Sequence, residues 1–478
     1  MSHSTALRTT ACVRFLAGLA GALFLVACGS DQVAGIQGSG APVASGVTSV
    51  GTITGFGSVF VDGVEYGTSS AQIRLDDQAG TESQLRVGQI VTVRGTLDAS
   101  GNAGTASEIS FVADAKGPIG QVDLTASTFT VLGQTIRVTD DTLFDESITP
   151  AELATLNAGA VVQVSGFLNA AGEIVASRID PTSSAEPQLK GSVQSLDATA
   201  QTFRINTLTV DYTAATVTGT LANSSSVIVR GNTVNGSGVL LATRVQVVGG
   251  NGAAANDNGR IEGLITSFTS NADFSVNGQR VLTDASTQFA LQGLTLGLDL
   301  RVKVRGTFNA SGALLATRVE AKRKNAGMIR GLVDAVSAAD GTLTVLGVVV
   351  TTGSATSFED RSDQRIRQFR LSDVRVGDYV EVRGVTGASG SGLTATLVER
   401  DRPDDQSQVR GVPRDIAEPN FTVLGVQVMV TPQTHFAGPG GQAKGREQFF
   451  NQPGTELVTV RGTVTGGILV ADRVQVRN

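Results

Sequence analysis

One five-residue pattern recurs six times along this chain and constrains its fold more than any other feature. Two valines separated by one residue are followed by Arg, or once by Ser, and then by Gly. The copies are Val91–Gly95, Val162–Gly166, Val227–Gly231, Val302–Gly306, Val380–Gly384 and Val458–Gly462. Successive glycines are 71, 65, 75, 78 and 78 residues apart. A period of this length indicates a duplicated structural unit, so we expect a repeated scaffold and not a single reaction centre.

The fourth copy shows the organisation of one unit most clearly. Alternating apolar and polar residues predict strands, and Asn277-Gly278 predicts a tight hairpin turn between two of them. The expected strands are Ile261–Ile265, Phe274–Val276, Arg280–Thr283, Leu300–Arg305 and Leu315–Val319. A Thr-x-Phe motif, Thr287–Phe289, precedes the long link to the fourth strand. Five strands in about 65 residues match a small Greek-key barrel of the OB type.

The N-terminus predicts export and lipid attachment. Residues 1–27 carry two arginines, no acidic residue and an apolar run at 15–26. That run is too short for a stable transmembrane helix and is typical of a secretory signal. The junction Leu25–Cys28 resembles a bacterial lipobox, in which the cysteine is acylated and becomes the first residue; an ordinary signal with a chance Cys28 is the alternative. Because Cys12 lies inside the signal, the mature chain would hold one thiol and no disulfide.

The expected location follows from this junction. Acyl chains on Cys28 would anchor the protein in place of a membrane-spanning helix. Gly29 and not Asp follows the cysteine, which by resemblance to Gram-negative lipoproteins predicts the outer membrane, facing either the periplasm or the cell surface. Residues 28–46 are rich in small residues and are expected to form a flexible tether.

The predicted fold is therefore all-β, a tandem array of about six small five-stranded OB-like Greek-key barrels after a lipoprotein signal peptide. A row of small β-sandwiches is the alternative. The expected segments are 1–27 for the signal, 28–46 for the tether, and 47–113, 117–181, 188–248, 259–322, 327–400 and 407–478 for the repeats.

One stretch and one recurring pattern resemble a known family. They are Ile53–Val64 and the pattern Val-Gly-x-x-Val-x-Val-x-Gly, seen at Val87–Gly95 and Val376–Gly384. They resemble bacterial secreted proteins and lipoproteins with tandem repeats of a domain of unknown function, DUF5666. The resemblance extends from about residue 47 to the end. It implies an architecture and an envelope setting, and no catalytic residue.

Charge and residue types argue against several functions. Removing residues 1–27 changes the net charge from −6 to −8, and such a surface repels phosphate backbones, so we expect no nucleic-acid partner. The basic run at 322–324 is expected to be a solvated linker. His435 is the only histidine of the mature chain and lacks a second histidine or cysteine for a metal site or triad, so we expect it on the surface. No catalytic residue, cofactor or metal site is predicted.

Paired acidic residues recur at three places in the chain: Asp76-Asp77, Asp140-Asp141 and Asp404-Asp405. None of the three has the spaced pattern of a calcium loop, so all are expected to be solvated turns.

The arginines are the most repeated charged residues. They are Arg94, Arg230, Arg305, Arg383 and Arg461 in the pattern, and Arg178, Arg244, Arg318 and Arg473 in the closing strand. They would either line a groove for an anionic polymer or lie on the outer faces of strands, paired with acidic or hydroxyl side chains. We favour surface pairing, because Ser165 replaces the arginine in the second copy without any other change in the pattern.

The largest departures from the repeat are two insertions before the long strand. The fifth copy inserts Arg361–Arg370, with Ile366 and Phe369, and the sixth inserts Gly438–Gly454, with Phe449 and Phe450. These four apolar residues either fold back on their own barrel, which we favour, or bind a partner such as an envelope protein or a polysaccharide.

The favoured function is a non-enzymatic, lipid-anchored binding or spacer scaffold of the cell envelope. The alternatives are a protein that binds a glycan or another anionic polymer, and a glycan hydrolase that uses two carboxylates. A hydrolase needs an acidic pair facing into a cleft, and no repeat carries an acidic residue at an inward-pointing apolar position. The sequence predicts no oligomeric state.

Overall fold

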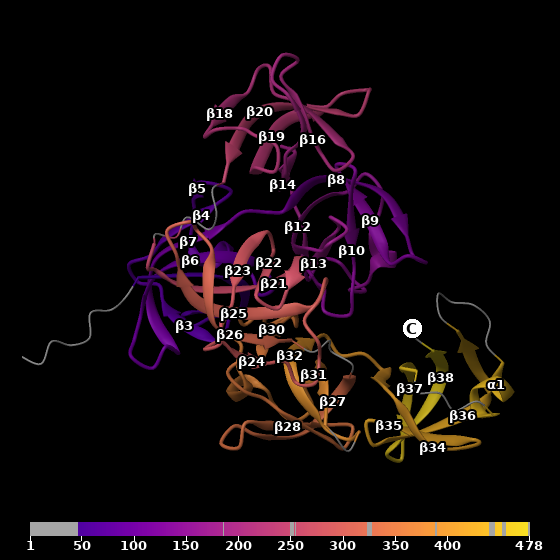
Figure 1. Cartoon of the computed structure of the whole chain (residues 1–478). Helices are drawn as coiled ribbons and strands as arrows, with labels where there is room; N and C mark the ends of the chain where they lie inside the picture. Colours follow the sequence, from indigo (N-terminus) through magenta and orange to yellow (C-terminus); the bar gives the residue numbers. More distant parts are fainter. Residues whose placement is uncertain are drawn as a thin grey trace, which may run out of the picture. The chain divides into compact units, whose positions relative to one another are not determined.

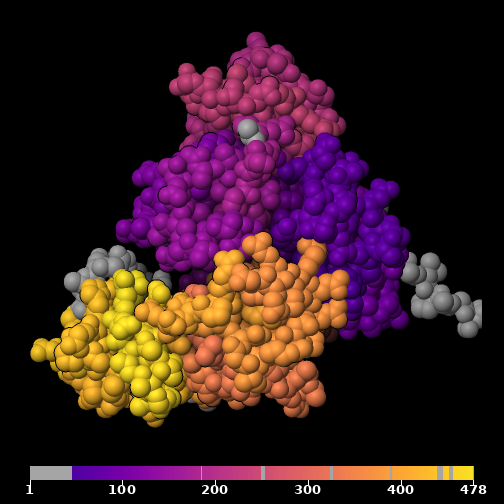
Figure 2. Space-filling model, turned by 180° about the vertical axis from the view of Figure 1, so that it is seen from behind, coloured from indigo at the N-terminus to yellow at the C-terminus, as the bar shows by residue number. Residues whose placement is uncertain are grey.

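The computed structural model describes residues 46–184, 186–248, 253, 255–322, 327–387, 390–438, 445–451 and 456–476. The predicted signal peptide, Cys28 and the tether up to residue 45 lie outside these residues. The described chain is built almost entirely of short β-strands, and strands that follow one another in the sequence lie close together (Figures 1 and 2). None of the helices in the described ranges has the length and apolar character needed to cross a bilayer.

The fourth repeat illustrates the topology. Its strands are β21 (Asn258–Ser270), β22 (Asp273–Val276), β23 (Gln279–Leu282), β24 (Gln288–Ala290), β25 (Arg301–Phe308) and β26 (Leu314–Ala321). Strand β21 pairs antiparallel with β22 and β25, β22 with β23, and β25 with β26, while β23 and β26 are parallel. The sheet therefore closes in the order β21-β22-β23-β26-β25 and returns to β21. This is the predicted five-stranded OB-like barrel.

The other repeats close in the same order. The first has β1 (Gly46–Gly55), β2 (Val59–Val61), β3 (Val64–Gly67), β4 (Gln72–Leu75), β5 (Gln78–Ala79), η1 (Glu82–Gln84), β6 (Ile90–Leu97) and β7 (Ala103–Phe111). The second has β8 (Ala115–Asp123), β9 (Thr128–Val131), β10 (Gln134–Arg137), β11 (Leu143–Phe144), η2 (Leu153–Thr155), β12 (Val161–Leu168) and β13 (Ile174–Pro181). The third has β14 (Gln188–Ser192), β15 (Gln194–Asp197), β16 (Thr202–Ile205), β17 (Leu208–Asp211), β18 (Thr216–Thr218), β19 (Ser226–Val234) and β20 (Val239–Val247).

The last two repeats follow. The fifth has β27 (Gly327–Ser337), β28 (Thr342–Val345), β29 (Val348–Thr351), β30 (Ser357–Asp360), η3 (Leu371–Asp373), β31 (Tyr379–Thr386) and β32 (Leu393–Asp401). The sixth has β33 (Ser407–Gly411), β34 (Pro413–Ala417), β35 (Asn420–Val423), β36 (Val426–Ala437), α1 (Arg446–Asn451), β37 (Val458–Thr465) and β38 (Ile468–Val476). In the third and sixth repeats the first strand is broken into two pieces.

The recurring pattern marks a β-bulge on the fourth strand of every barrel. In β25 the side chains of Val302 and Val304 are fully buried, and the register with β26 shifts between Arg305 and Gly306. A Cβ atom on any pattern glycine would lie only 1.9–2.6 Å from a backbone carbonyl oxygen of the closing strand. These glycines are Gly95, Gly166, Gly231, Gly306, Gly384 and Gly462. The two strands therefore approach so closely at the bulge that only glycine fits.

The Thr-x-Phe motif supports the same bulge from the side. The threonine Oγ1 donates a hydrogen bond of 2.6–2.8 Å to the carbonyl of the alanine that pairs with the pattern glycine. The four threonine–alanine pairs are Thr142–Ala176, Thr287–Ala316, Thr356–Ala395 and Thr434–Ala471. The motif thus fixes the link against the closing strand, and it recurs for a structural reason.

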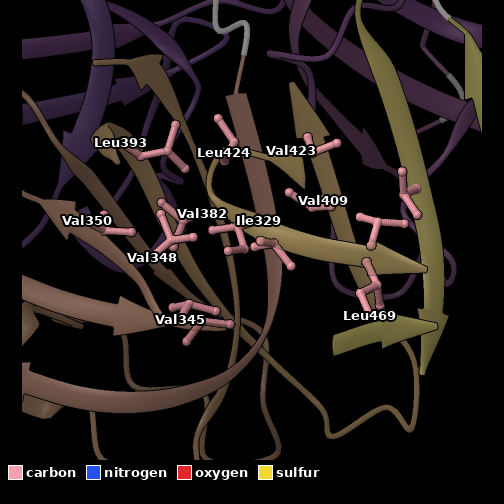
Figure 3. Packing of buried hydrophobic residues seen from close by; sticks show 14 of the residues in the cluster. Ile329, Val345, Val348, Val350, Val382, Leu393, Val409, Val423, Leu424 and Leu469 are labelled. Atoms are coloured by element: carbon pink, nitrogen blue, oxygen red, sulfur yellow. The ribbon is translucent and has the colours of Figure 1, made fainter. Parts of the chain in front are cut away.

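First strands join barrels in pairs. Strand β1 pairs in parallel with β21, β8 pairs antiparallel with β14, and β27 pairs antiparallel with β33. The first repeat is thereby joined to the fourth, the second to the third and the fifth to the sixth. The apolar cores of the fifth and sixth repeats merge, and Figure 3 shows residues of the fifth, such as Val382, in one cluster with residues of the sixth, such as Val409.

Candidate functional site

The recurring arginines of the pattern and of the closing strand point away from their own barrel cores, but several are covered by another repeat. The side chains of Arg178, Arg230 and Arg383 are only 2, 7 and 11 % exposed, whereas those of Arg94 and Arg461 are 43 and 56 % exposed. The prediction of surface pairing is therefore wrong for the three buried arginines. Periodicity within one repeat identifies the outer face of a strand, but it does not show whether another repeat packs on that face.

Arg178 joins three repeats through one guanidinium group. Its Nε donates to Asp180 in its own strand at 2.6 Å, and its Nη1 donates to Glu359 of the fifth repeat at 2.9 Å. The same Nη1 lies 3.0 Å from the carbonyl oxygen of Val87 in the first repeat. A buried cation surrounded in this way holds the repeats together and is not available to a ligand.

Ser165 explains why one copy of the pattern lacks arginine. Its Oγ accepts a 2.8 Å hydrogen bond from the backbone N–H of Ile90 in the first repeat, and Ser165 is only 3 % exposed. Nearby, the hydroxyl of Ser177 donates to the carbonyl of Gly88 at 2.7 Å. The first and second repeats approach too closely here for an arginine side chain. This contact explains why serine replaces arginine in the second copy, and the sequence pattern did not reveal it.

Two of the three acidic pairs also link repeats. Asp76 accepts from Lys116 at 3.0 Å, Asp77 pairs with Arg230 at 2.8 Å, and each ion pair joins the first repeat to a later one. Asp140 pairs with Arg410 of the sixth repeat at 2.6 Å. The prediction of solvated turns is therefore wrong for Asp76 and Asp77, whose side chains are each only 21 % exposed. Asp140 does lie in a turn and keeps 47 % of its side chain exposed. In the third pair, Asp404 accepts a hydrogen bond from the backbone N–H of Gln406 at 3.1 Å and forms a 3.9 Å ion pair with the exposed Arg461.

Three glutamates lie side by side on the fifth barrel where it meets the second. Glu399 on β32 is paired in register with Glu359 on β30 and with Glu381 on β31. Arg361, only 5 % exposed, pairs with Glu399 at 3.3 Å. Burial raises the pKa of Glu399 to about 7; Arg361 opposes this rise, and the flanking Glu359 and Glu381 add to it.

The raised pKa of Glu399 predicts that the free energy of unfolding depends on pH. A carboxyl group whose pKa is higher in the folded protein stabilises the fold below its ordinary pKa, and this stabilisation is lost as the pH rises through about 7. Glu399→Gln should remove a decrease of about 3 kcal/mol in the free energy of unfolding between pH 5 and pH 8. Urea unfolding of wild type and variant at both pH values measures the difference.

A matched control is Glu447→Gln, which changes an exposed carboxylate of α1. It should leave the pH dependence as it is in the wild type. Equal pH dependence in wild type and Glu399→Gln would contradict the assignment.

The apolar residues of the two insertions pack onto their own barrels. Phe369 and Phe449 are 2 and 4 % exposed, and Ile366 and Phe450 pack against the same core while partly buried. The ring of Phe449 lies 5.1 Å from Phe421 and 5.5 Å from Phe436, between centroids. These side chains pack against the core of their own barrels, as the favoured interpretation predicted. Binding of a partner by the two insertions stays a prediction.

The remaining sequence candidates lie apart from one another. His435 is exposed on β36. Lys322 does not belong to a solvated linker, because it pairs with the buried Glu262 at 2.6 Å; residues 323 and 324 lie outside the described ranges. Over the described ranges, His, Cys, Asp and Glu side chains form no group of three that could hold a metal ion.

Comparison with protein families accounts for the repeats. The model of one family, a domain of unknown function named DUF5666, matches residues 47–110, 116–180, 190–246, 262–320, 330–399 and 410–475. The chain belongs to the DUF5666 family. The match confirms the resemblance seen in the sequence. A search of curated proteins finds no match to the chain.

One cleft is lined by residues of three DUF5666 repeats and was not foreseen from the sequence. It has a volume of about 430 Å³. Charged residues of its wall are Asp76 from the first repeat, Lys116 from the second, Glu186 from the segment that follows, and Arg230 and Arg244 from the third. No local motif marks it, because its lining residues are spread along the sequence from Leu75 to Arg244. The only signal in the sequence was that Asp76, Arg230 and Arg244 all belong to recurring charged sets.

Proposed function

We propose that this DUF5666 protein is a non-enzymatic, lipid-anchored scaffold of the cell envelope that binds a ligand between its repeats. The observation that carries the proposal is the use of buried charged side chains as connectors. Arg178, Arg361 and Arg383 each contact repeats other than their own. A chain whose recurring charges serve to assemble its barrels is organised as a scaffold, with binding surfaces formed where repeats meet.

The resemblance of Leu25–Cys28 to a lipobox supports the envelope location, and the outer membrane of a Gram-negative bacterium is the proposed site. Binding of a glycan or another anionic polymer is the second candidate function. The cleft between the first three repeats favours it, because two arginines and one lysine line a space of a size typical for small ligands.

The anchor is tested by Cys28→Ser. Without the thiol no acyl chain can be attached, so we expect the variant to move from the membrane fraction to the soluble periplasmic fraction. Fractionation followed by immunoblotting, with metabolic labelling by a fatty acid, measures both effects. A variant that stays in the membrane fraction would rule out the lipid anchor. A replacement at an exposed residue far from the signal, such as His435→Gln, serves as the control and should remain with the membrane.

A further inference from the structure

We propose that the cleft between the first three repeats binds an acidic sugar, with the sugar carboxylate held by Arg230 and Arg244. The inference rests on the proposed binding function and specifies its ligand class and position.

The first observation is the pairing of two arginines across neighbouring strands. Arg230 on β19 lies directly opposite Arg244 on β20, and both side chains line the cleft. Like charges placed opposite each other on one face of a sheet destabilise it unless an anion lies between them. In the first repeat the corresponding position opposite Arg94 is Glu108, which forms an ion pair at 3.3 Å. The third repeat has no such carboxylate across the strand. The fourth and sixth repeats also place two arginines opposite each other, so the distinguishing feature of the third is that its pair lines a cleft.

The second observation is a buried nitrogen without a partner. Arg230 Nε donates to Gln188 Oε1 at 2.7 Å, and Nη1 pairs with Asp77 Oδ2 at 2.8 Å. Its third nitrogen, Nη2, is buried and has no hydrogen-bond partner among the described residues, although the side chain is 93 % buried. Buried polar groups are normally hydrogen-bonded. Other buried arginine nitrogens also lack a partner, but Arg230 lies at a cleft, where its Nη2 could donate to a ligand atom. Because two contacts already fix the guanidinium plane, the site is preorganised.

The other residues that line the cleft indicate which kind of anion it would bind. Apart from Leu75, the uncharged lining residues carry hydroxyl or amide groups, at Gln78, Gln163, Thr182, Ser184 and Thr243. The cations Lys116 and Arg230 are each paired with an aspartate, so the cleft has little excess positive charge. Such a site suits one carboxylate on a hydroxyl-rich molecule better than a densely charged polyphosphate. A uronic acid unit has this chemistry.

Calorimetric titration of the full chain in mild detergent with trigalacturonate tests the assignment, with neutral galactotriose and inorganic phosphate as comparison ligands. Arg244→Gln is the informative variant, because Arg244 is exposed and its loss should leave the fold intact. Arg473→Gln is the matched control, since Arg473 is also exposed and lies opposite the pattern arginine of the sixth repeat. We expect trigalacturonate to bind the wild type and Arg473→Gln equally, and Arg244→Gln at least tenfold more weakly.

Several results would overturn the proposal. These are absence of trigalacturonate binding, equal affinity of Arg244→Gln and wild type, or equal binding of neutral galactotriose. Binding of phosphate without trigalacturonate would identify a site for a free oxyanion and would overturn the sugar assignment. Failure of the envelope proposal would appear separately, in the fractionation of Cys28→Ser, and would leave these titrations unaffected.

Discussion

Gly306→Ala should unfold the fourth repeat. A Cβ at this position would lie 2.0 Å from the carbonyl oxygen of Leu315 and 2.9 Å from the Cα of Ala316. Both are backbone atoms of β26, which cannot move aside without breaking its pairing with β25. We expect the free energy of unfolding to fall by at least about 4 kcal/mol, a loss that few single substitutions cause. Urea unfolding followed by circular dichroism measures it.

The same repeat offers a matched control. Gly297 lies in the link before β25, and a Cβ there would meet nothing within 4 Å. Gly297→Ala should therefore change the free energy of unfolding by less than about 1 kcal/mol, because it only restricts the unfolded chain. If both alanine variants unfolded at the urea concentration of the wild type, the steric explanation of the repeated glycine would be wrong.

The strands and the barrel were predictable because their signals are local. The alternation Val302-Lys303-Val304 reports which side chains enter the core, and Gly306 marks the close approach of two adjacent strands. Both features arise within one repeat of about 65 residues. The Phe449 insertion was predictable for a similar reason, since adjacent aromatic side chains are unfavourable in water and the nearest apolar surface belongs to their own barrel.

The role of the charges was not predictable because it depends on contacts between repeats. Arg178 and Arg473 occupy equivalent positions in closing strands, yet the first is almost fully buried and the second is exposed. Nearby they differ in that Asp180, which binds Arg178, is replaced by Gln475 after Arg473, but an acidic neighbour does not indicate burial. The difference arises from which barrels meet, including the pairing of β1 with β21 about 210 residues further along. Ser165 favoured surface pairing when only the sequence was considered, but its replacement of arginine instead marks the place where another repeat approaches closely.

Arg178→Met should be the most destabilising replacement among the arginines that connect repeats. The methionine fills part of the space, but the carboxylates of Asp180 and Glu359 lose their shared cation while they remain 10 and 14 % exposed. Breaking a buried pair by removal of one partner typically costs about 3–5 kcal/mol, because the remaining charge is uncompensated. The same change at the half-exposed Arg461 should cost less than about 1 kcal/mol. Urea unfolding measures both values.

A double-mutant cycle separates the ion pair from general packing. If Arg178 stabilises the protein through Glu359, then Glu359→Gln should relieve part of the loss caused by Arg178→Met, because no charge is then left without its partner at that position. A coupling energy above about 1 kcal/mol would show that the contact between the second and fifth repeats is electrostatic. Additive effects would mean instead that the arginine acts within its own strand through Asp180, and that the repeats are held together by their apolar surfaces and strand pairing.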